Sequence, residues 1–220
     1  MTFSVGYICL PVSQGKGVLF MKIGIMGGTF NPIHHGHLIL SEYIRINEEL
    51  DKIIFIPTGN PPHKDRQNIL DGEIRLEMVR LAIKNNPYFT YSDIEVKKPE
   101  ISYTIDTVIH LKEKYRGCDL YMIIGADTLL SLYSWKDIFY ILGQVKFIVA
   151  DRLGLHDDDV EKEINRLNNK YSANIISVDS PVIEVSSTLI RHRLKADLSI
   201  KYLLPEVVEE YIIENKYYSS

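Results

Sequence analysis

Short apolar runs alternate with longer segments of helical periodicity along most of this chain. The apolar runs cover residues 23–26, 53–57, 89–92, 120–124, 145–150 and 175–178, and their length and content predict buried strands. Apolar residues recur with a helical period in segments 38–50, 71–85, 103–115, 160–170, 187–194 and 205–215, which predicts helices. Strands that alternate with helices indicate an α/β fold, in which a Rossmann-like, doubly wound parallel sheet has helices on both faces.

Two of the helical segments allow finer predictions. Asp71 stands where its side chain can cap the helix that follows it. In segment 103–115 we expect Ile105, Val108, Ile109 and Leu111 to face the core. The carboxyl ends of parallel strands share one edge of a sheet, and ligands bind there, so functional residues are expected just after the strands.

The first twenty residues differ from the rest of the chain. They contain Pro11, Gly15 and Gly17 and show no clear period. They lack a basic start followed by an apolar block, so a signal peptide is not predicted. Met21 opens the first predicted strand. We therefore expect residues 1–20 to be a leader outside the fold, with Met21 as the natural start, and residues 21–220 to form a single domain.

Composition narrows the class of protein. A length of 220 residues with 45% hydrophobic content suits one globular domain. A net charge of −4, from 25 basic and 29 acidic residues, gives no footprint for general nucleic-acid binding. No apolar run reaches about 18 residues, so no membrane-spanning helix is expected. Cys9 and Cys118 do not make a disulfide framework, and a reducing cytoplasm fits them best.

A glycine turn leads from the first predicted strand into the first predicted helix, in the run Gly27-Gly28-Thr29-Phe30-Asn31-Pro32-Ile33-His34-His35-Gly36-His37. His34 and His37 are three positions apart and can share a helix face. Backbone N–H groups and the positive end of the helix dipole meet the imidazoles there. This combination predicts a phosphate site.

Other interpretations of the run are a plain tight turn, structural histidines or a metal site. No Cys, Asp or Glu lies inside the run to complete a zinc site. The G-x-G-x-x-G and G-x-x-x-x-G-K-S/T patterns are both missing, which disfavours a dinucleotide-binding dehydrogenase and a P-loop ATPase.

A second cluster precedes a late helix, in Val185-Ser186-Ser187-Thr188-Leu189-Ile190-Arg191. Hydroxyl groups at a helix start can be caps and nothing more. Arg191 changes the balance because it lies one turn beyond Ser187, so its guanidinium can reach back to the start of the helix. Hydroxyls, N–H groups and an arginine together predict a second phosphate cradle.

Asp127 and Trp135 have ordinary interpretations when each is taken alone. Asp127 follows the strand that ends in Ile124-Gly125-Ala126, where it can be a helix N-cap. Trp135 is the only tryptophan, and a single tryptophan is most often a core residue.

Taken together, these motifs resemble those of the nucleotidyltransferase superfamily marked by H-x-G-H. The chain matches its G-G-S/T-F-D/N-P-x-H-x-G-H and I-S-S-T-x-I/L-R patterns, with Asn31 where many relatives carry Asp and Val185 where Ile is usual. Pro57-Thr58-Gly59-Asn60-Pro61-Pro62-His63-Lys64, Ser102-Tyr103-Thr104-Ile105-Asp106-Thr107 and Leu132-Tyr133-Ser134-Trp135 resemble segments of bacterial nicotinate mononucleotide adenylyltransferases. The likeness runs from Lys22 to Tyr218.

This resemblance implies a nucleotidyltransferase (HUP-like) fold and transfer of AMP from ATP to nicotinate mononucleotide in a cytoplasmic monomer or homodimer. It implies that His34, His37, Lys64 and Arg191 are catalytic. Implied ATP-binding residues are Gly27, Gly28, Thr29, Phe30, His34, His37, Gly125, Asp127, Ser186, Ser187, Thr188 and Arg191. Implied substrate-binding residues are Asn31, Lys64, Arg75, Tyr103, Thr104, Trp135, Lys136 and Arg152, where Arg75 either touches substrate or braces the loop. Mg²⁺ would be held mainly by the ATP phosphates.

Several alternatives stay open at this point. A protein of the same fold can act on nicotinamide mononucleotide, phosphopantetheine or glycerol phosphate. A non-catalytic nucleotide sensor would need the same phosphate cradles. A redox enzyme that uses NAD is disfavoured by the missing G-x-G-x-x-G pattern.

Overall fold

The main feature of the fold is a six-stranded parallel sheet. The computed structural model describes residues 12–13, 18–59, 69–152 and 158–219. Its strands are β3 (Lys22–Gly28), β4 (Lys52–Pro57), β5 (Phe89–Tyr91), β6 (Asp119–Gly125), β7 (Lys146–Arg152) and β8 (Ile175–Ser180). Their spatial order is β5-β4-β3-β6-β7-β8. This is a doubly wound order, in which successive strands are added to one side of β3 and then, from β6 onward, to the other side. The predicted fold class and all the predicted strands are confirmed.

The inner strands are mainly apolar because both faces of the sheet are covered. In β4, Ile54 and Ile56 enter one core cluster, while Ile53 and Phe55 enter the other. Successive side chains of a strand point to opposite faces, so an unbroken apolar run fills two cores at once.

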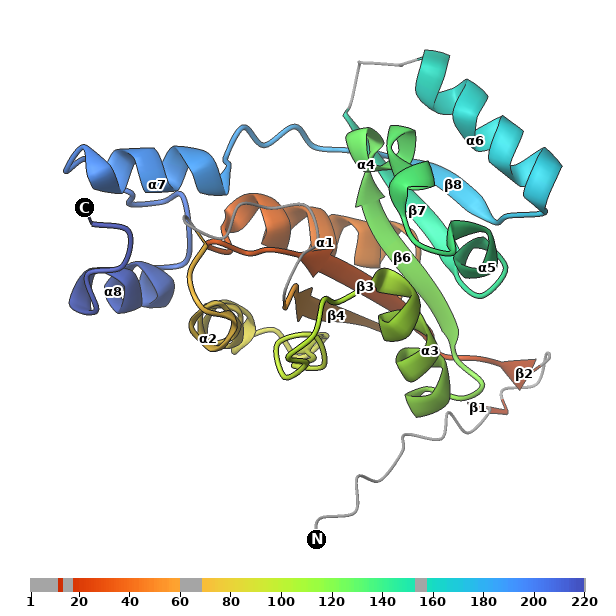
Figure 1. Cartoon of the computed structure of the whole chain (residues 1–220), viewed down its shortest axis with the longest axis horizontal. Coiled ribbons are helices and arrows are strands. Elements are labelled where there is room, and N and C mark those ends of the chain that lie inside the picture. Colours follow the sequence, from red (N-terminus) through yellow and green to blue (C-terminus); the bar gives the residue numbers. More distant parts are fainter. Residues whose placement is uncertain (1–11, 14–17, 60–68, 153–157, 220) are drawn as a thin grey trace, which may run out of the picture.

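Helices pack on both faces of the sheet (Figure 1). One face carries α1 (His35–Asn47), α2 (Gly72–Ile83), α7 (Ser187–Lys195) and α8 (Glu206–Glu214). The other face carries α3 (Thr104–Lys114), α4 (Ala126–Leu130), α5 (Ile138–Leu142) and α6 (Asp158–Tyr171). The predicted N-cap of α2 is confirmed, since the Asp71 carboxylate accepts a hydrogen bond from the backbone N–H of Glu73 at 2.8 Å.

The structure also corrects details of the sequence prediction. The short helices α4 and α5 and a 3₁₀ turn, η2 (Leu132–Ser134), were not expected. Helix α1 begins at His35 rather than near residue 38, which puts His37 in its first turn. The inward position predicted for Ile109 is wrong: its side chain is 42% exposed, and Thr107 is buried in α3 instead.

The N-terminal segment and the cysteines add two observations. β1 (Val12–Ser13) and β2 (Val18–Leu19) form an antiparallel pair separate from the main sheet. Cys118 is disulfide-bonded, and its partner sulfur lies outside the described residues. Distance along the sequence does not limit distance in space, so the spacing of the cysteines did not exclude this bond. The cysteines therefore no longer argue for a reducing compartment.

Gly24 gives a test of how tightly β3 is packed. A Cβ atom at Gly24 would lie 2.5 Å from Ile53 Cδ1 and 3.0 Å from Leu50 Cδ1. We expect Gly24→Ala to lower the free energy of unfolding by about 1–3 kcal/mol, measured by urea denaturation, because it overpacks the core. Gly27→Ala in the same strand is the control, since nothing lies within 4 Å of its added Cβ. Equal losses in both variants would contradict this account.

Candidate active site

The turn between β3 and α1 has an unusual backbone. Phe30 has a positive φ of 48°, and the Asn31-Pro32 peptide bond is cis. The Phe30 side chain is 2% exposed and packs in the core, against Phe55 and edge-on to His37. The turn therefore places backbone atoms of residues 29–32 at the carboxyl edge of the sheet, just ahead of His34.

His34 and His37 form a stacked pair at the start of α1. Their ring centroids are 3.7 Å apart at an interplanar angle of 29°. His34 is the N-cap residue of α1 and is 6% exposed. A Cβ atom at Gly36 would lie 3.0 Å from the His34 imidazole, so glycine leaves room for the ring.

Hydrogen bonding fixes the state of these rings. The His34 backbone N–H donates to His37 Nδ1 at 3.3 Å, so in the neutral ring the proton sits on Nε2. Burial, and then the charge of the neighbouring His34, lower the pKa of His37 to about 3. Burial and then the charge of His35 lower the pKa of His34 to about 4. Both imidazoles are therefore neutral near pH 7 before any anion binds, and His37 can donate a hydrogen bond through Nε2.

His34 carries an unpartnered atom in this site. Its Nδ1 atom is buried and has no hydrogen-bond partner among the residues that the structure describes. An unpaired buried polar atom is costly unless water or a ligand satisfies it.

The N-terminus of α7 lies against the same turn. Ser187 Oγ donates to the Pro32 carbonyl at 2.8 Å, and Arg191 Nη1 donates to the Asn31 carbonyl at 2.8 Å. Arg191 Nη2 also donates to Thr188 Oγ1 at 3.3 Å, which confirms that the guanidinium reaches back toward the helix start. Ser186 is the N-cap, whose Oγ accepts from the backbone N–H of Leu189. The two predicted phosphate cradles are thus joined by direct hydrogen bonds.

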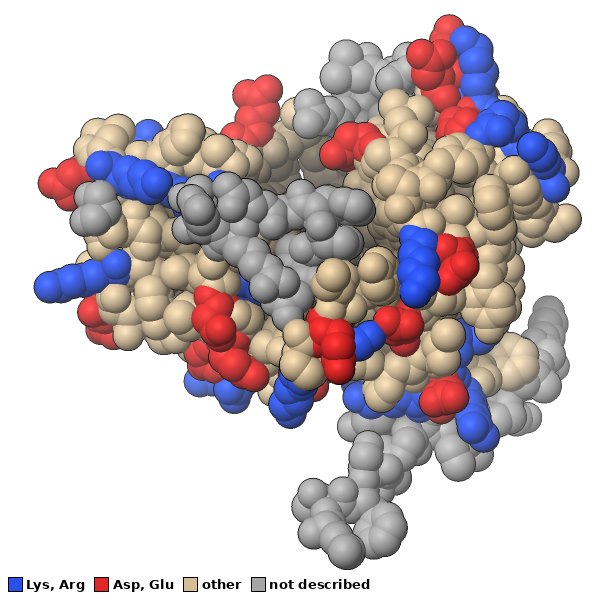
Figure 2. Space-filling view, in the orientation of Figure 1, with Lys and Arg blue, Asp and Glu red and all other residues tan. Residues whose placement is uncertain are grey.

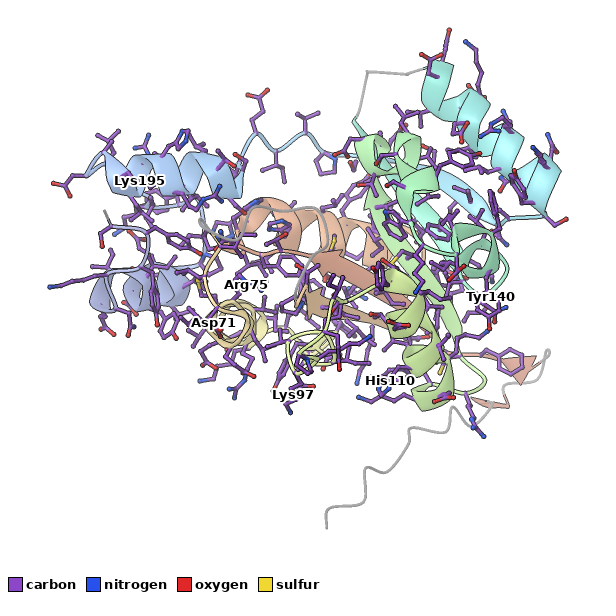
Figure 3. All side chains as sticks on the ribbon, viewed as in Figure 1. Asp71, Arg75, Lys97, His110, Tyr140 and Lys195 are labelled. Carbon is purple, nitrogen blue, oxygen red and sulfur yellow. The ribbon has the colours of Figure 1, made fainter. Side chains whose placement is uncertain are left out.

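Arg75 is a fully buried brace on the other side of the turn, near the start of α2 (Figure 3). It is 1% exposed. Its guanidinium donates to the carbonyls of Leu70, Thr29 and Thr58 at 2.8, 2.6 and 2.7 Å. Of the two roles that the sequence left open, these contacts support bracing of the loops.

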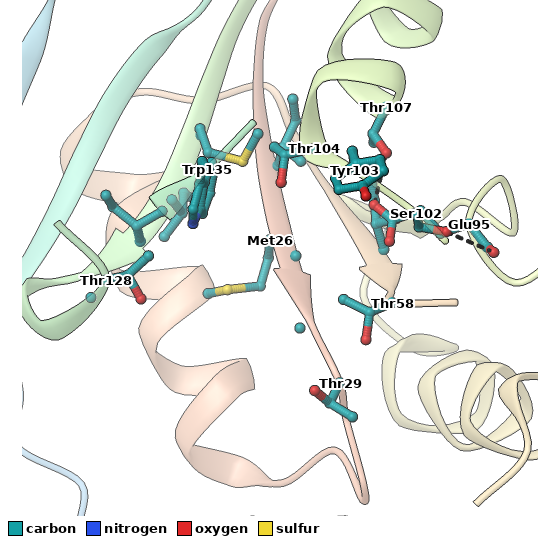
Figure 4. A pocket seen from close by; sticks show the side chains of 18 of the residues that line it. Met26, Thr29, Thr58, Glu95, Ser102, Tyr103, Thr104, Thr107, Thr128 and Trp135 are labelled. Atoms are coloured by element: carbon teal, nitrogen blue, oxygen red, sulfur yellow. Dashed lines mark hydrogen bonds between the residues drawn. The ribbon is translucent and has the colours of Figure 1, made fainter. Parts of the chain in front are cut away.

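A cavity of about 440 Å³ opens where β3 and β6 diverge, at the switch point of the sheet (Figure 4). Eight of the site residues predicted from the sequence line this cavity: Gly27, Gly28, Thr29, Tyr103, Thr104, Gly125, Trp135 and Lys136. His34, His37 and Arg191 are not part of this lining, so the glycine–histidine run contributes to the cavity wall through Gly27, Gly28 and Thr29.

One wall of the cavity is aromatic. Trp135 is half-buried and packs against the core cluster on the face of the sheet that carries α3, α4, α5 and α6. Tyr103 is the N-cap residue of α3, and Lys136 Nζ lies 4.6 Å from the centre of its ring. A flat ring and a cation at one end of a cavity suit a planar ligand that carries negative charge.

Glu95 also lines the cavity, although no sequence motif marks it. Its Oε1 accepts from Thr107 Oγ1 at 2.7 Å. Burial raises the pKa of the Glu95 carboxyl, while hydrogen bonds from Thr107 and the Gly59 N–H act in the opposite direction. Glu95 thus ties α3 to the end of β4. A lone glutamate in a polar loop carries no local signal of this role.

The remaining predicted residues are placed less fully. Asp127 is exposed at the second position of α4, whose N-cap is Gly125, so the N-cap interpretation of Asp127 is wrong. Arg152 is the last residue of β7, at the carboxyl edge of the sheet, and its side chain is not described. Lys64 lies outside the described residues.

Surface and metal chemistry add little to this picture. On the face in Figure 2, positive and negative side chains are interspersed. Within the described residues, no group of three or more His, Cys, Asp or Glu side chains could hold a metal ion. None of the described helices is both long and apolar enough to cross a bilayer.

The depressed histidine pKa values predict a loss of stability in acid. As the pH falls below the ordinary value of 6.5, the unfolded chain takes up protons on imidazoles that stay neutral in the folded state, down to about 4. The histidines therefore lower the free energy of unfolding as the pH falls below 6.5, and they have no such effect well above that pH. We expect His37→Gln to reduce this fall, measured by urea denaturation at about pH 7 and about pH 5. His110→Gln, an exposed site on α3, is the control; a fall equal in all three proteins would contradict the assignment.

Known proteins share both the sequence and the fold. The cytidylyltransferase-like family model matches residues 25–193. A protein of Clostridium novyi (strain NT) named probable nicotinate-nucleotide adenylyltransferase is 44% identical over 185 residues, which cover 84% of this chain and 92% of that protein. A protein of the same name from Thermoanaerobacter sp. (strain X514) is 42% identical over 193 residues, covering 87% and 92%.

Solved structures agree on the fold. The nicotinic acid mononucleotide adenylyltransferase of Plasmodium falciparum complexed with NaAD has a TM-score of 0.72 at 21% identity, covering 90% of this chain and 97% of that one. A putative nicotinate-nucleotide adenylyltransferase from Vibrio parahaemolyticus has a TM-score of 0.64, covering 90% and 96%. The chain belongs to the cytidylyltransferase-like family and, within it, to the nicotinate-nucleotide adenylyltransferases.

Proposed function

We propose that this protein transfers AMP from ATP to nicotinate mononucleotide, giving deamido-NAD and pyrophosphate in NAD biosynthesis. The observation that carries the proposal is the contact between the start of α7 and the turn that precedes α1. Arg191 and Ser187 donate to the turn that precedes His34, beside a cavity with an aromatic end. Relatives at 42% and 44% identity bear the matching name.

The chemistry requires alignment and charge stabilisation more than proton transfer. The 5′-phosphate oxygen of the mononucleotide forms a bond to the α-phosphorus of ATP, while the bond from that phosphorus to the bridging oxygen breaks and pyrophosphate leaves. A phosphate monoester is already largely ionised near neutral pH, since its second pKa is about 6, so no general base is needed. Positioning and electrostatic stabilisation are then the main terms.

The neutral histidines suit this role as hydrogen-bond donors. His37 offers Nε2–H to a phosphate oxygen because Nδ1 is occupied by the His34 N–H. Arg191 supplies a full positive charge at the start of α7, and Lys64 is proposed to supply another. Mg²⁺ fits as an ion held by the ATP phosphates and water, where it would offset phosphate charge, and needs no cluster of protein ligands.

The acceptor is proposed to lie at the aromatic end of the cavity. There the pyridine ring would stack on Trp135, with Lys136 and the start of α3 beside it. The nearby cation of Lys136 favours a carboxylate over a carboxamide.

The decisive assay is pyrophosphate release from ATP with nicotinate mononucleotide and, in parallel, with nicotinamide mononucleotide. Faster release with the acid supports the proposal, and faster release with the amide would reassign the acceptor. Absence of release with either would favour a nucleotide sensor.

His37→Ala is expected to lower kcat by about 100-fold or more if the imidazole stabilises the transition state. Circular dichroism and thermal unfolding check that the variant folds. Turnover close to wild type would remove His37 from the mechanism.

Trp135→Ala is expected to raise the KM for the mononucleotide far more than the KM for ATP, because stacking is lost at one end of the cavity only. Tyr133→Ala is the matched control, because Tyr133 is an exposed aromatic in the 3₁₀ turn that precedes Trp135 and is not part of the cavity lining. Equal changes in both KM values would make Trp135 a packing residue.

A further inference from the structure

The C-terminal tail reaches the phosphate-binding turn. Tyr218 Oη donates to Asn31 Oδ1 at 2.8 Å, across 187 positions of sequence. The same oxygen accepts from the Leu70 N–H at 3.2 Å, and the Asn31 carbonyl accepts from Arg191. Asn31 is 4% exposed, so the tail meets it inside the protein.

The end of α8 is built to direct the tail this way. Lys216 has a positive φ of 56°. Its N–H donates to the Ile213 carbonyl, and the Tyr217 N–H donates to the Ile212 carbonyl, the two bonds of a Schellman motif. Tyr218 follows with a φ of 64°, a backbone conformation that non-glycine residues seldom adopt. The chain therefore reverses within three residues, and the C-terminus lies beside α7 and α8 (Figure 1).

Tyr218 also sits close to both arginines that hold the turn. Arg75 and Arg191 are the charged groups that act on its hydroxyl. Burial nevertheless raises the pKa of Tyr218, so the hydroxyl stays protonated and donates. Arg75 braces the turn through the Thr29 carbonyl and Arg191 through the Asn31 carbonyl. The Tyr218 hydroxyl is a third donor, to the Asn31 side chain.

We propose that Tyr218 is a positioning residue for adenylyl transfer, which holds the Asn31 turn and, through it, Arg191 and the histidine pair in register for ATP. This inference rests on the proposed function. Tyr218 touches none of the reacting atoms, so it acts through Asn31. Its effect should fall on ATP, because Trp135 belongs to the core cluster on the opposite face of the sheet.

The test compares Tyr218→Phe with Tyr217→Phe. Both variants remove one hydroxyl and keep the ring, but the Tyr217 hydroxyl bonds Tyr211 instead of the turn. We expect Tyr218→Phe to lower kcat/KM for ATP by about fivefold or more, the scale of one lost hydrogen bond, with KM for nicotinate mononucleotide unchanged. Tyr217→Phe should stay within about twofold of wild type, because its hydroxyl bonds Tyr211 and the ring is kept.

Two outcomes would overturn the inference. Equal kinetics in the two variants would show that the hydroxyl has no role in the site. A loss in Tyr218→Phe that vanishes on cooling, in step with a lowered Tm, would make the residue merely structural. Calorimetric titration with ATP alone separates this test from the proposed function: weaker ATP binding in Tyr218→Phe supports positioning even if the wild-type protein releases no pyrophosphate.

Discussion

The structure depends most on the hydrogen bonds that hold the turn between β3 and α1. The carbonyls of Thr29, Asn31 and Pro32 are satisfied by Arg75, Arg191 and Ser187. Irregular backbone at this edge would otherwise leave buried acceptors unpaired, at a cost of about 1–3 kcal/mol each. The sheet brings the turn to its carboxyl edge, and these donors help to fix its path into the histidine pair.

Local periodicity was enough to predict the strands and longer helices. Inner strands such as β4 are nearly unbroken apolar runs because they fill both cores, and α6 shows its buried stripe at Val160, Ile164 and Leu167. The helices α4 and α5 were not predicted because each has five residues, which is too few for a helical period to show. Ile109 was predicted to face the core because it is hydrophobic and lies next to the apolar stripe of α3. The stripe instead includes the small polar residue Thr107, which hydrophobicity alone does not reveal.

The candidate site was partly visible in the sequence, because the parts proposed to bind phosphate are compact motifs. The histidine run and the Ser187–Arg191 cluster each carry their own signal. Glu95 and Tyr218 do not, since their partners Thr107 and Asn31 are reached only through the fold. Arg75 is an intermediate case: its position was noticed, but only burial shows that its charge faces backbone carbonyls.

The contacts of α7 with the β3–α1 turn also set an order on biosynthesis. The turn leaves the ribosome early, whereas its donors Ser187 and Arg191 belong to the last part of the chain. A nascent chain that already contains β3, β4 and β6 lacks the donors that the Asn31 and Pro32 carbonyls have in the folded protein. The path of this turn is therefore completed only once synthesis is nearly finished.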